Sequence, residues 1–169
     1  MRHTLDRLYN AAGVLAALFL VGTLLMVVLG VTGRLLHFHV PGTDSYAGYC
    51  MAAAGFLALA YTLQRGEHIR VTLLIEHLGP GVCRALELWS LGVATVLSGA
   101  FAYYSIRLSF QSWDFNDIST GNDATPLWLP QLSMAFGVTI LFIAFVDNFV
   151  GELKGQRIRK APAEAMHNE

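Results

Sequence analysis

The sequence predicts an all-α integral membrane protein with four transmembrane helices, cytoplasmic amino and carboxyl termini, and a short amphipathic helix in the inner loop. Two observations predict this fold class. The chain is 54% hydrophobic and only 14% charged, a composition atypical of soluble domains. It also contains four apolar runs long enough, or nearly so, to cross a hydrocarbon layer of about 30 Å as helices. These runs are Leu8–Gly33, Tyr46–Leu63, Leu86–Ile106 and Leu127–Val150.

The distribution of cationic residues predicts the orientation of the helices. If the amino terminus is inside, the outer loops contain only Arg34 and Arg107. The other cations then all lie in inner segments: Arg2, Arg7, Arg65, Arg70, Arg84, Lys154, Arg157, Arg159 and Lys160. Such a bias places both termini in the cytoplasm. The first run is also too long for the apolar region of a cleaved signal, about 7–15 residues, so we expect an uncleaved first span in a multi-pass membrane protein.

Residues 1–153 are expected to form the membrane domain, followed by a basic to mixed-charge cytoplasmic tail over residues 154–169. The two outer segments are short and rich in polar turn formers. In the inner loop, apolar residues with i, i+3, i+4, i+7 spacing form one helical stripe: Val71, Leu74, Ile75 and Leu78. This pattern predicts a short helix at the inner membrane surface, or a connector packed against the other helices. Gly79 and Pro80 mark its end.

Small residues recur along one face of two spans. The first stripe comprises Gly48, Ala52 and Gly55, and the second comprises Gly92, Thr95, Gly99 and Ala102. Because lipid removes most of the hydrophobic drive for helices to associate, close backbone approach at small residues has to supply it. The stripes therefore predict helix contacts. These contacts lie either within the chain, which is the simpler interpretation, or with a partner subunit.

Few charged residues fall inside the predicted spans, and none lies at the middle of one. Asp147 is about one turn from the inner end of the fourth span, where it is either an interface residue or a polar contact to another membrane subunit. Aromatic residues near the span ends are interpreted as anchors in the headgroup zone: Trp89, Trp113, Trp128, Tyr46, Tyr49, Tyr103 and Tyr104.

Several kinds of site are not expected. All six histidines lie outside the spans, which argues against haem held between helices. The acidic outer loop, with Asp114, Asp117 and Asp123, lacks the closing glutamate of a calcium-binding loop and is interpreted as a solvated turn. Cys50 and Cys83 fall on opposite sides of the bilayer, so they are expected to stay unpaired. Without a phosphate loop, nucleophile elbow or basic stripe, the sequence predicts no enzyme, cofactor, metal or nucleic-acid partner.

The run Arg65-Gly66-Glu67-His68-Ile69-Arg70-Val71 resembles the inner-loop signature of the small membrane subunit of TRAP (tripartite ATP-independent periplasmic) transporters. The same family pattern includes an arginine at the end of the first span, here Arg34, and an entry to the fourth span that resembles Thr125–Pro130. The resemblance covers about residues 8–153. The family often has a tryptophan followed by acidic residues at the start of the second span, whereas this chain has only Asp44 in that region.

The resemblance implies an accessory or scaffold subunit of a sodium-coupled secondary transporter that imports an organic acid. It implies a large multi-spanning partner subunit and a transient periplasmic substrate-binding protein. From it we expect Arg65, Gly66, His68 and Arg70 to contact lipid phosphates or the large subunit; the alternative is that the charged ones are ordinary positive-inside anchors. Asp44 and Asp147 are candidate polar subunit contacts. Two alternatives are a membrane anchor subunit of an electron-transfer complex and a small transporter that acts alone.

Overall fold

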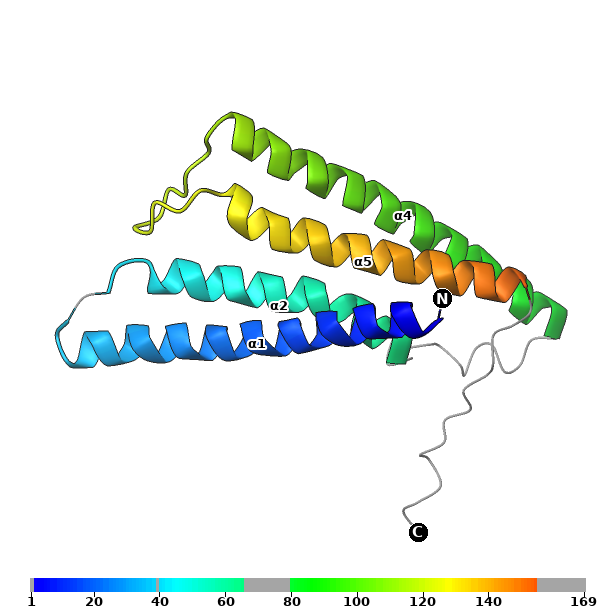
Figure 1. The fold of residues 1–169 in the computed structure, drawn as a ribbon, viewed down its shortest axis with the longest axis horizontal. Coiled ribbons are helices and arrows are strands. Elements are labelled where there is room, and N and C mark those ends of the chain that lie inside the picture. Colours follow the sequence, from blue (N-terminus) through cyan, green and yellow to red (C-terminus); the bar gives the residue numbers. More distant parts are fainter. Residues whose placement is uncertain (1, 39, 66–79, 155–169) are drawn as a thin grey trace, which may run out of the picture.

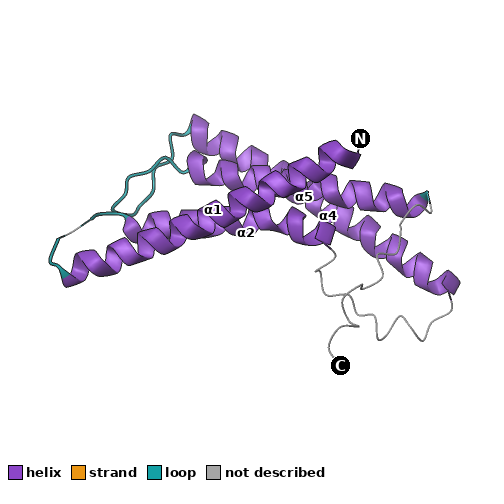
Figure 2. Ribbon diagram, turned by 60° about the horizontal axis from the view of Figure 1, so that its bottom comes forward, coloured by secondary structure: helices purple, strands orange, loops and turns teal. Residues whose placement is uncertain are grey.

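The computed structural model describes residues 2–38, 40–65 and 80–154 of the chain. The predicted amphipathic helix, together with Gly66, His68 and Arg70, lies outside the described residues, as does most of the tail. The described part contains four helices: α1 (Arg2–Leu35), α2 (Thr43–Arg65), α4 (Pro80–Asp114) and α5 (Trp128–Leu153) (Figure 1). Loops make up the rest of that part, and it contains no strand beyond one isolated bridge (Figure 2).

The four-helix membrane fold is confirmed. Within the described residues, four helical segments are long and apolar enough to cross a membrane: Leu5–Leu35, Thr43–Arg65, Arg84–Asp114 and Trp128–Leu153. All four helices are longer than the predicted apolar runs, and the two longest are α1, with 34 residues, and α4, with 35. At about 1.5 Å per residue each is about 50 Å long, which exceeds the hydrocarbon thickness. Their polar ends, such as Gln111–Asp114, therefore extend beyond the hydrocarbon, or the helices tilt.

The helices form two antiparallel hairpins, α1–α2 and α4–α5, which cross at an angle (Figure 2). α2 contacts both α1 and α5, and α5 contacts both α2 and α4. The resulting spatial order is α1, α2, α5, α4, with α1 and α4 at opposite edges of an open row (Figure 1). The start of α1 and the end of α5 lie at the same end of the molecule.

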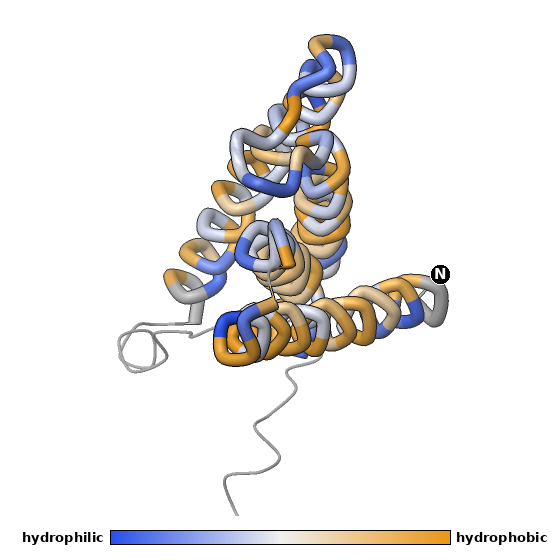
Figure 3. Tube along the Cα trace, turned by 90° about the vertical axis from the view of Figure 1, so that its left-hand side faces the viewer, coloured by the Kyte–Doolittle hydropathy of each residue, from blue (hydrophilic) through white to orange (hydrophobic). Residues whose placement is uncertain are grey.

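The buried core joins α1, α2 and α5 and consists largely of small side chains. Its members are Tyr9, Ala12, Ala16, Leu57, Ala60, Ile140, Leu141 and Ala144. Alanine lets backbones approach closely, which is how helices gain dispersion contacts in lipid. By contrast, most large aliphatic residues of α1 are exposed, and α1 is mostly coloured hydrophobic along its length (Figure 3). This apolar surface suits contact with lipid tails or a partner helix.

Glycines mark the closest helix crossings. A Cβ on Gly137 of α5 would lie 2.7 Å from the backbone carbonyl carbon and oxygen of Phe56 in α2. A Cβ on Gly13 of α1 would lie 2.7 Å from the Tyr61 ring. Both distances are shorter than carbon atoms tolerate, so the absence of a side chain at these two positions sets the helix spacing.

Candidate functional site

The two hairpin turns meet at one end of the molecule and bind each other through hydroxyl and carboxylate groups. The hydroxyl of Tyr49, near the start of α2, donates to Asp123 Oδ2 at 3.0 Å. Ser119 Oγ donates to Asp123 Oδ1 at 2.9 Å. The Thr125 hydroxyl donates to the Tyr46 hydroxyl at 3.1 Å. The loop between α4 and α5 is thereby tied to the first turns of α2.

Backbone contacts give this loop a defined shape. Ile118 and Pro126 form an antiparallel bridge. Beside it, the Ser119 N–H donates to the Thr125 carbonyl at 2.8 Å, and the Leu127 N–H donates to the Asp117 carbonyl at 2.9 Å. The loop is thus a short hairpin-like projection that presents Asp123 to α2, and not an unstructured connector.

Asp123 is the polar centre of the junction. Desolvation by burial alone would raise the pKa of the Asp123 carboxyl. Hydrogen bonds involving Thr125, Ser119, its own backbone N–H and Tyr49 outweigh that effect and hold this pKa well below its ordinary value. Asp123 therefore remains a carboxylate throughout the physiological pH range, and its charge is directed toward hydroxyl donors.

Gly42, just before α2, allows the loop to approach. Its φ is +82°, a left-handed conformation that favours glycine. A Cβ at this position would also lie 2.7 Å from the Asp123 Cβ. Conformation and space thus both require glycine at the point where the two turns touch.

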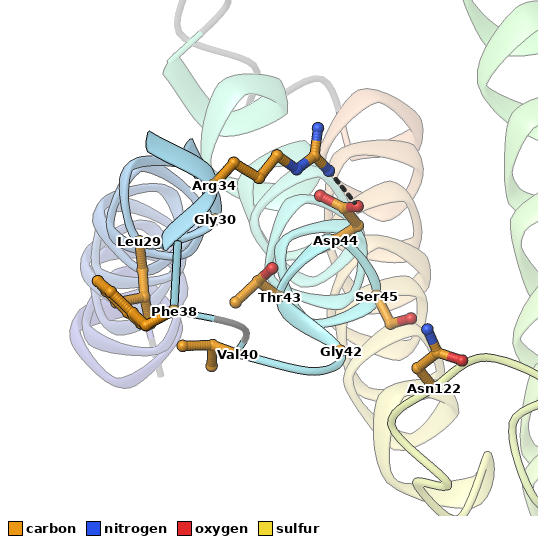
Figure 4. A pocket seen from close by; sticks show the side chains of 10 residues that line it. All are labelled: Leu29, Gly30, Arg34, Phe38, Val40, Gly42, Thr43, Asp44, Ser45 and Asn122. Carbon is orange, nitrogen blue, oxygen red and sulfur yellow. Dashed lines mark hydrogen bonds and ion pairs between the residues drawn. The ribbon is translucent and has the colours of Figure 1, made fainter. Parts of the chain in front are cut away.

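A pocket of about 250 Å³ lies beside this junction (Figure 4). Arg34, at the end of α1, reaches across it to Asp44, at the start of α2, with Nη2 and Oδ2 3.0 Å apart. The two side chains are 76% and 83% exposed, so the pair contributes only about 0–1 kcal/mol. Asp44, expected as a contact to another subunit, therefore has a partner within the chain. Asn122 and Ser45 also line the pocket.

Sequence reasoning missed most of this junction. The outer loop was expected to be a solvated turn, whereas it docks on α2 through Asp123. Tyr46 and Tyr49 were interpreted as membrane anchors, and their hydroxyl groups also bind the loop. The other predicted anchors include Trp113 and Trp128, whose rings pack edge to face with centroids 4.8 Å apart. No local pattern identifies Asp123, because its partner Tyr49 is 74 residues away.

The two small-residue stripes face different surroundings. Gly48, Ala52 and Gly55 of α2 are all exposed, and a Cβ on Gly48 or Gly55 would meet nothing within 4 Å. In α4, a Cβ on Gly99 would lie 2.9 Å from Phe142 of α5, and one on Gly92 would lie 3.6 Å from Phe149. The α4 stripe therefore packs against α5, whereas the α2 stripe points away from the described helices.

A second set of small residues in α4 escaped the sequence analysis. Four serines are buried along one face of this helix: Ser98, Ser105, Ser109 and Ser112. Their spacing of seven, four and three follows one helical face, which is the signal that could have revealed them. Ser109 Oγ donates to the Ser105 carbonyl at 3.1 Å. The Ser105 hydroxyl, buried with its residue 2% exposed, has no hydrogen-bond partner among the described residues.

The other end of the molecule gathers the remaining candidates. Arg65 ends α2 and lies over the Tyr61 ring, 4.9 Å from its centroid, a cation–π arrangement. Asp147 of α5 is exposed and lies within electrostatic range of Tyr9 in α1. Among the described residues, no group of three or more His, Cys, Asp or Glu side chains is arranged to hold a metal ion.

Comparison with known proteins gives one family. The model of the family described as "Tripartite ATP-independent periplasmic transporters, DctQ component" matches residues 23–155. This range includes the outer junction, both small-residue stripes and all of α2, α4 and α5. A search of the curated proteins finds no match.

Proposed function

Because the chain belongs to the DctQ family of tripartite ATP-independent periplasmic (TRAP) transporters, we propose that it holds the larger membrane subunit in place during solute import. Members of this family are inner-membrane transport components and not enzymes. The finer proposal is that the complex is sodium-coupled, that it imports an organic acid, and that a periplasmic binding protein delivers this acid. In this proposal the present chain is a static scaffold, and substrate and sodium bind elsewhere.

The observation that carries the scaffold proposal is the exposed small-residue stripe of α2. Gly48 and Gly55 have open space where a side chain would be, although α2 is the helix that contacts both α1 and α5. Small residues on an apolar helix face permit the close packing that stabilises helix pairs in lipid. A helix of the large subunit is the proposed occupant of this face.

The test is co-purification from membranes through a tag on the large subunit. Gly48→Leu and Gly55→Leu should together reduce recovery of this chain at least tenfold, because two added side chains push the partner helix away. Ala100→Leu, at an exposed position of α4, is the control for added bulk on a lipid-facing surface. Recovery equal to that of the control would remove the α2 face from the proposal.

The inner-loop signature provides a second contact in this proposal. Arg65 is available at the end of α2, and His68 and Arg70 follow it in the sequence. We expect His68→Ala combined with Arg70→Ala to weaken recovery with the large subunit and to lower uptake. Unchanged recovery and uptake would show that these residues serve only as positive-inside anchors.

A further inference from the structure

A pocket of about 320 Å³ lies at the end of the molecule opposite the outer junction, between the start of α1 and the end of α2. Its lining residues are Asp6, Tyr9, Asn10, Tyr61, Gln64 and Arg65. None of these residues takes part in the α2 stripe or in the outer junction. The volume falls at the lower end of the range for small-ligand sites, about 300–1,000 Å³.

Two buried donors in this pocket have no partner. Tyr9 is 2% exposed, and neither its hydroxyl nor Gln64 Nε2 forms a hydrogen bond of acceptable geometry among the described residues. The two side chains are close enough to influence each other, but their contact leaves both atoms unsatisfied. Buried polar groups without a partner are rare, so an unmatched pair in one pocket indicates a missing acceptor.

The charges of the pocket are also unmatched. Arg65 and Asp6 line the same pocket, yet the ion pair found among the described residues is the distant Arg34–Asp44. Arg65 instead lies over the Tyr61 ring. A cation and a carboxylate that share a pocket without joining each other leave room for a ligand that carries both signs.

We infer that this pocket binds the phosphoethanolamine headgroup of a membrane phospholipid. The phosphate accepts hydrogen bonds from the Tyr9 hydroxyl and Gln64 Nε2 and pairs with the Arg65 guanidinium, a preferred phosphate partner. The ammonium group pairs with Asp6, and the exposed Asp147 nearby adds negative potential. The pocket lies where two apolar spans end, which is the depth of lipid headgroups.

Native mass spectrometry of the full-length chain, purified together with its membrane partners, tests this site. The titrated lipids are dioleoyl phosphatidylethanolamine, the matching phosphatidylglycerol, and dioleoylglycerol, which lacks phosphate. Phosphatidylethanolamine should bind best, phosphatidylglycerol several-fold more weakly, and dioleoylglycerol weakest. Inorganic phosphate at millimolar concentration should not displace the lipid, because it lacks the ammonium group and the acyl chains.

Three conservative variants separate the contacts to the phosphate from the contact to the ammonium group. Tyr9→Phe and Arg65→Gln should each weaken phosphatidylethanolamine binding roughly tenfold, as expected for a lost bond to a charged group. Asp6→Asn should erase the preference over phosphatidylglycerol. The matched controls Tyr103→Phe, Arg107→Gln and Asp114→Asn change exposed residues elsewhere and should stay within about twofold of the unmodified chain.

Three outcomes would overturn the assignment. These are equal binding of dioleoylglycerol, binding unchanged by both Tyr9→Phe and Arg65→Gln, and displacement of the lipid by inorganic phosphate. The last result would identify a site for a free anion. Arg65 is exposed, so Arg65→Gln should leave the fold intact. This variant therefore decides the test if Tyr9→Phe proves unstable. None of these readouts depends on the proposed transport role.

Discussion

Gly137 of α5 lies directly against the backbone of Phe56 in α2, at the crossing that joins the two helical hairpins. A Cβ at this position would be 2.7 Å from the Phe56 carbonyl group and 2.9 Å from its Cβ. Backbone atoms cannot rotate out of the way as a side-chain tip can. The spacing of the hairpins therefore depends on having no side chain at position 137.

Gly137→Ala should separate the hairpins and lower the free energy of unfolding by about 1–3 kcal/mol, the usual effect of overpacking. The measurement is thermal unfolding in detergent, followed by circular dichroism. Gly55→Ala is the matched control, since a Cβ there meets nothing within 4 Å. Equal stability of the two variants would mean that the hairpins can adjust their spacing freely.

Ser105→Ala should be neutral or should stabilise the fold by up to about 1 kcal/mol, because it removes a buried hydroxyl that has no partner. Ser109→Ala should instead destabilise the fold slightly, since Ser109 donates to the Ser105 carbonyl. Ser105→Leu should overpack the α4–α5 contact. Thermal unfolding compares all three, and a clear loss of stability in Ser105→Ala would show that its hydroxyl does bind a partner.

The depressed pKa of Asp123 predicts how the outer junction responds to acid. A carboxyl whose pKa is lowered by folding contributes stability above its unfolded pKa, about 3.9, and loses it as pH falls through the folded value. The loop should therefore stay docked between pH 7 and about 4 and release only in stronger acid. Trp113 and Trp128 flank the loop, and their fluorescence reports its release.

Tyr49→Phe combined with Ser119→Ala removes two of the donors to Asp123. The fluorescence transition should then shift toward the ordinary pH range of an aspartate. Tyr104→Phe combined with Ser90→Ala, both at exposed positions of α4, serves as the control. A transition at the same pH in both double variants would contradict the assigned cause of the depressed pKa.

Gly42→Ala should loosen the same junction by a different route. The left-handed φ of +82° costs a side chain about 1–2 kcal/mol, and the new methyl group would collide with Asp123. Hydrogen exchange of the Ser119 amide, which is bonded to the Thr125 carbonyl, should accelerate. Gly81→Ala adds a methyl group into open space and should leave that exchange rate unchanged.

The proposed orientation can be checked with single cysteines in a chain carrying Cys50→Ser and Cys83→Ser. In intact cells, Ser119→Cys in the outer loop should react with a membrane-impermeant maleimide. Lys154→Cys, at the carboxyl-terminal cap of α5, should react only after the membrane is opened. The reverse labelling pattern would place both termini outside and contradict the charge-based prediction.

The spans could be predicted from the sequence because membrane insertion depends on local hydrophobicity, which a run such as Leu127–Val150 displays directly. The spatial order of the helices could not be predicted. Apolar helix faces are nearly equivalent in lipid, so which helices pair depends on a few close contacts. Gly137 is one glycine among the chain's 16, and nothing nearby in the sequence distinguishes it. The stripe around Gly99 was visible because four small residues share one helical face.

The polar sites were harder to predict because they join residues far apart in the chain. Tyr49 and Asp123 belong to different hairpins. The headgroup pocket combines the first turns of α1 with the last turn of α2. Arg65 was singled out by the resemblance of the inner-loop run and Asp147 by its place near a span end, but Tyr9 and Gln64 have no such signal.

The open row of helices has a geometric consequence for solute movement. Helices placed around a ring enclose an axis along which a molecule can travel, whereas the described helices form an open row in the order α1, α2, α5, α4. In the proposed complex, an open row of this kind would enlarge the area that the larger subunit occupies in the membrane, without adding a path of its own for the solute.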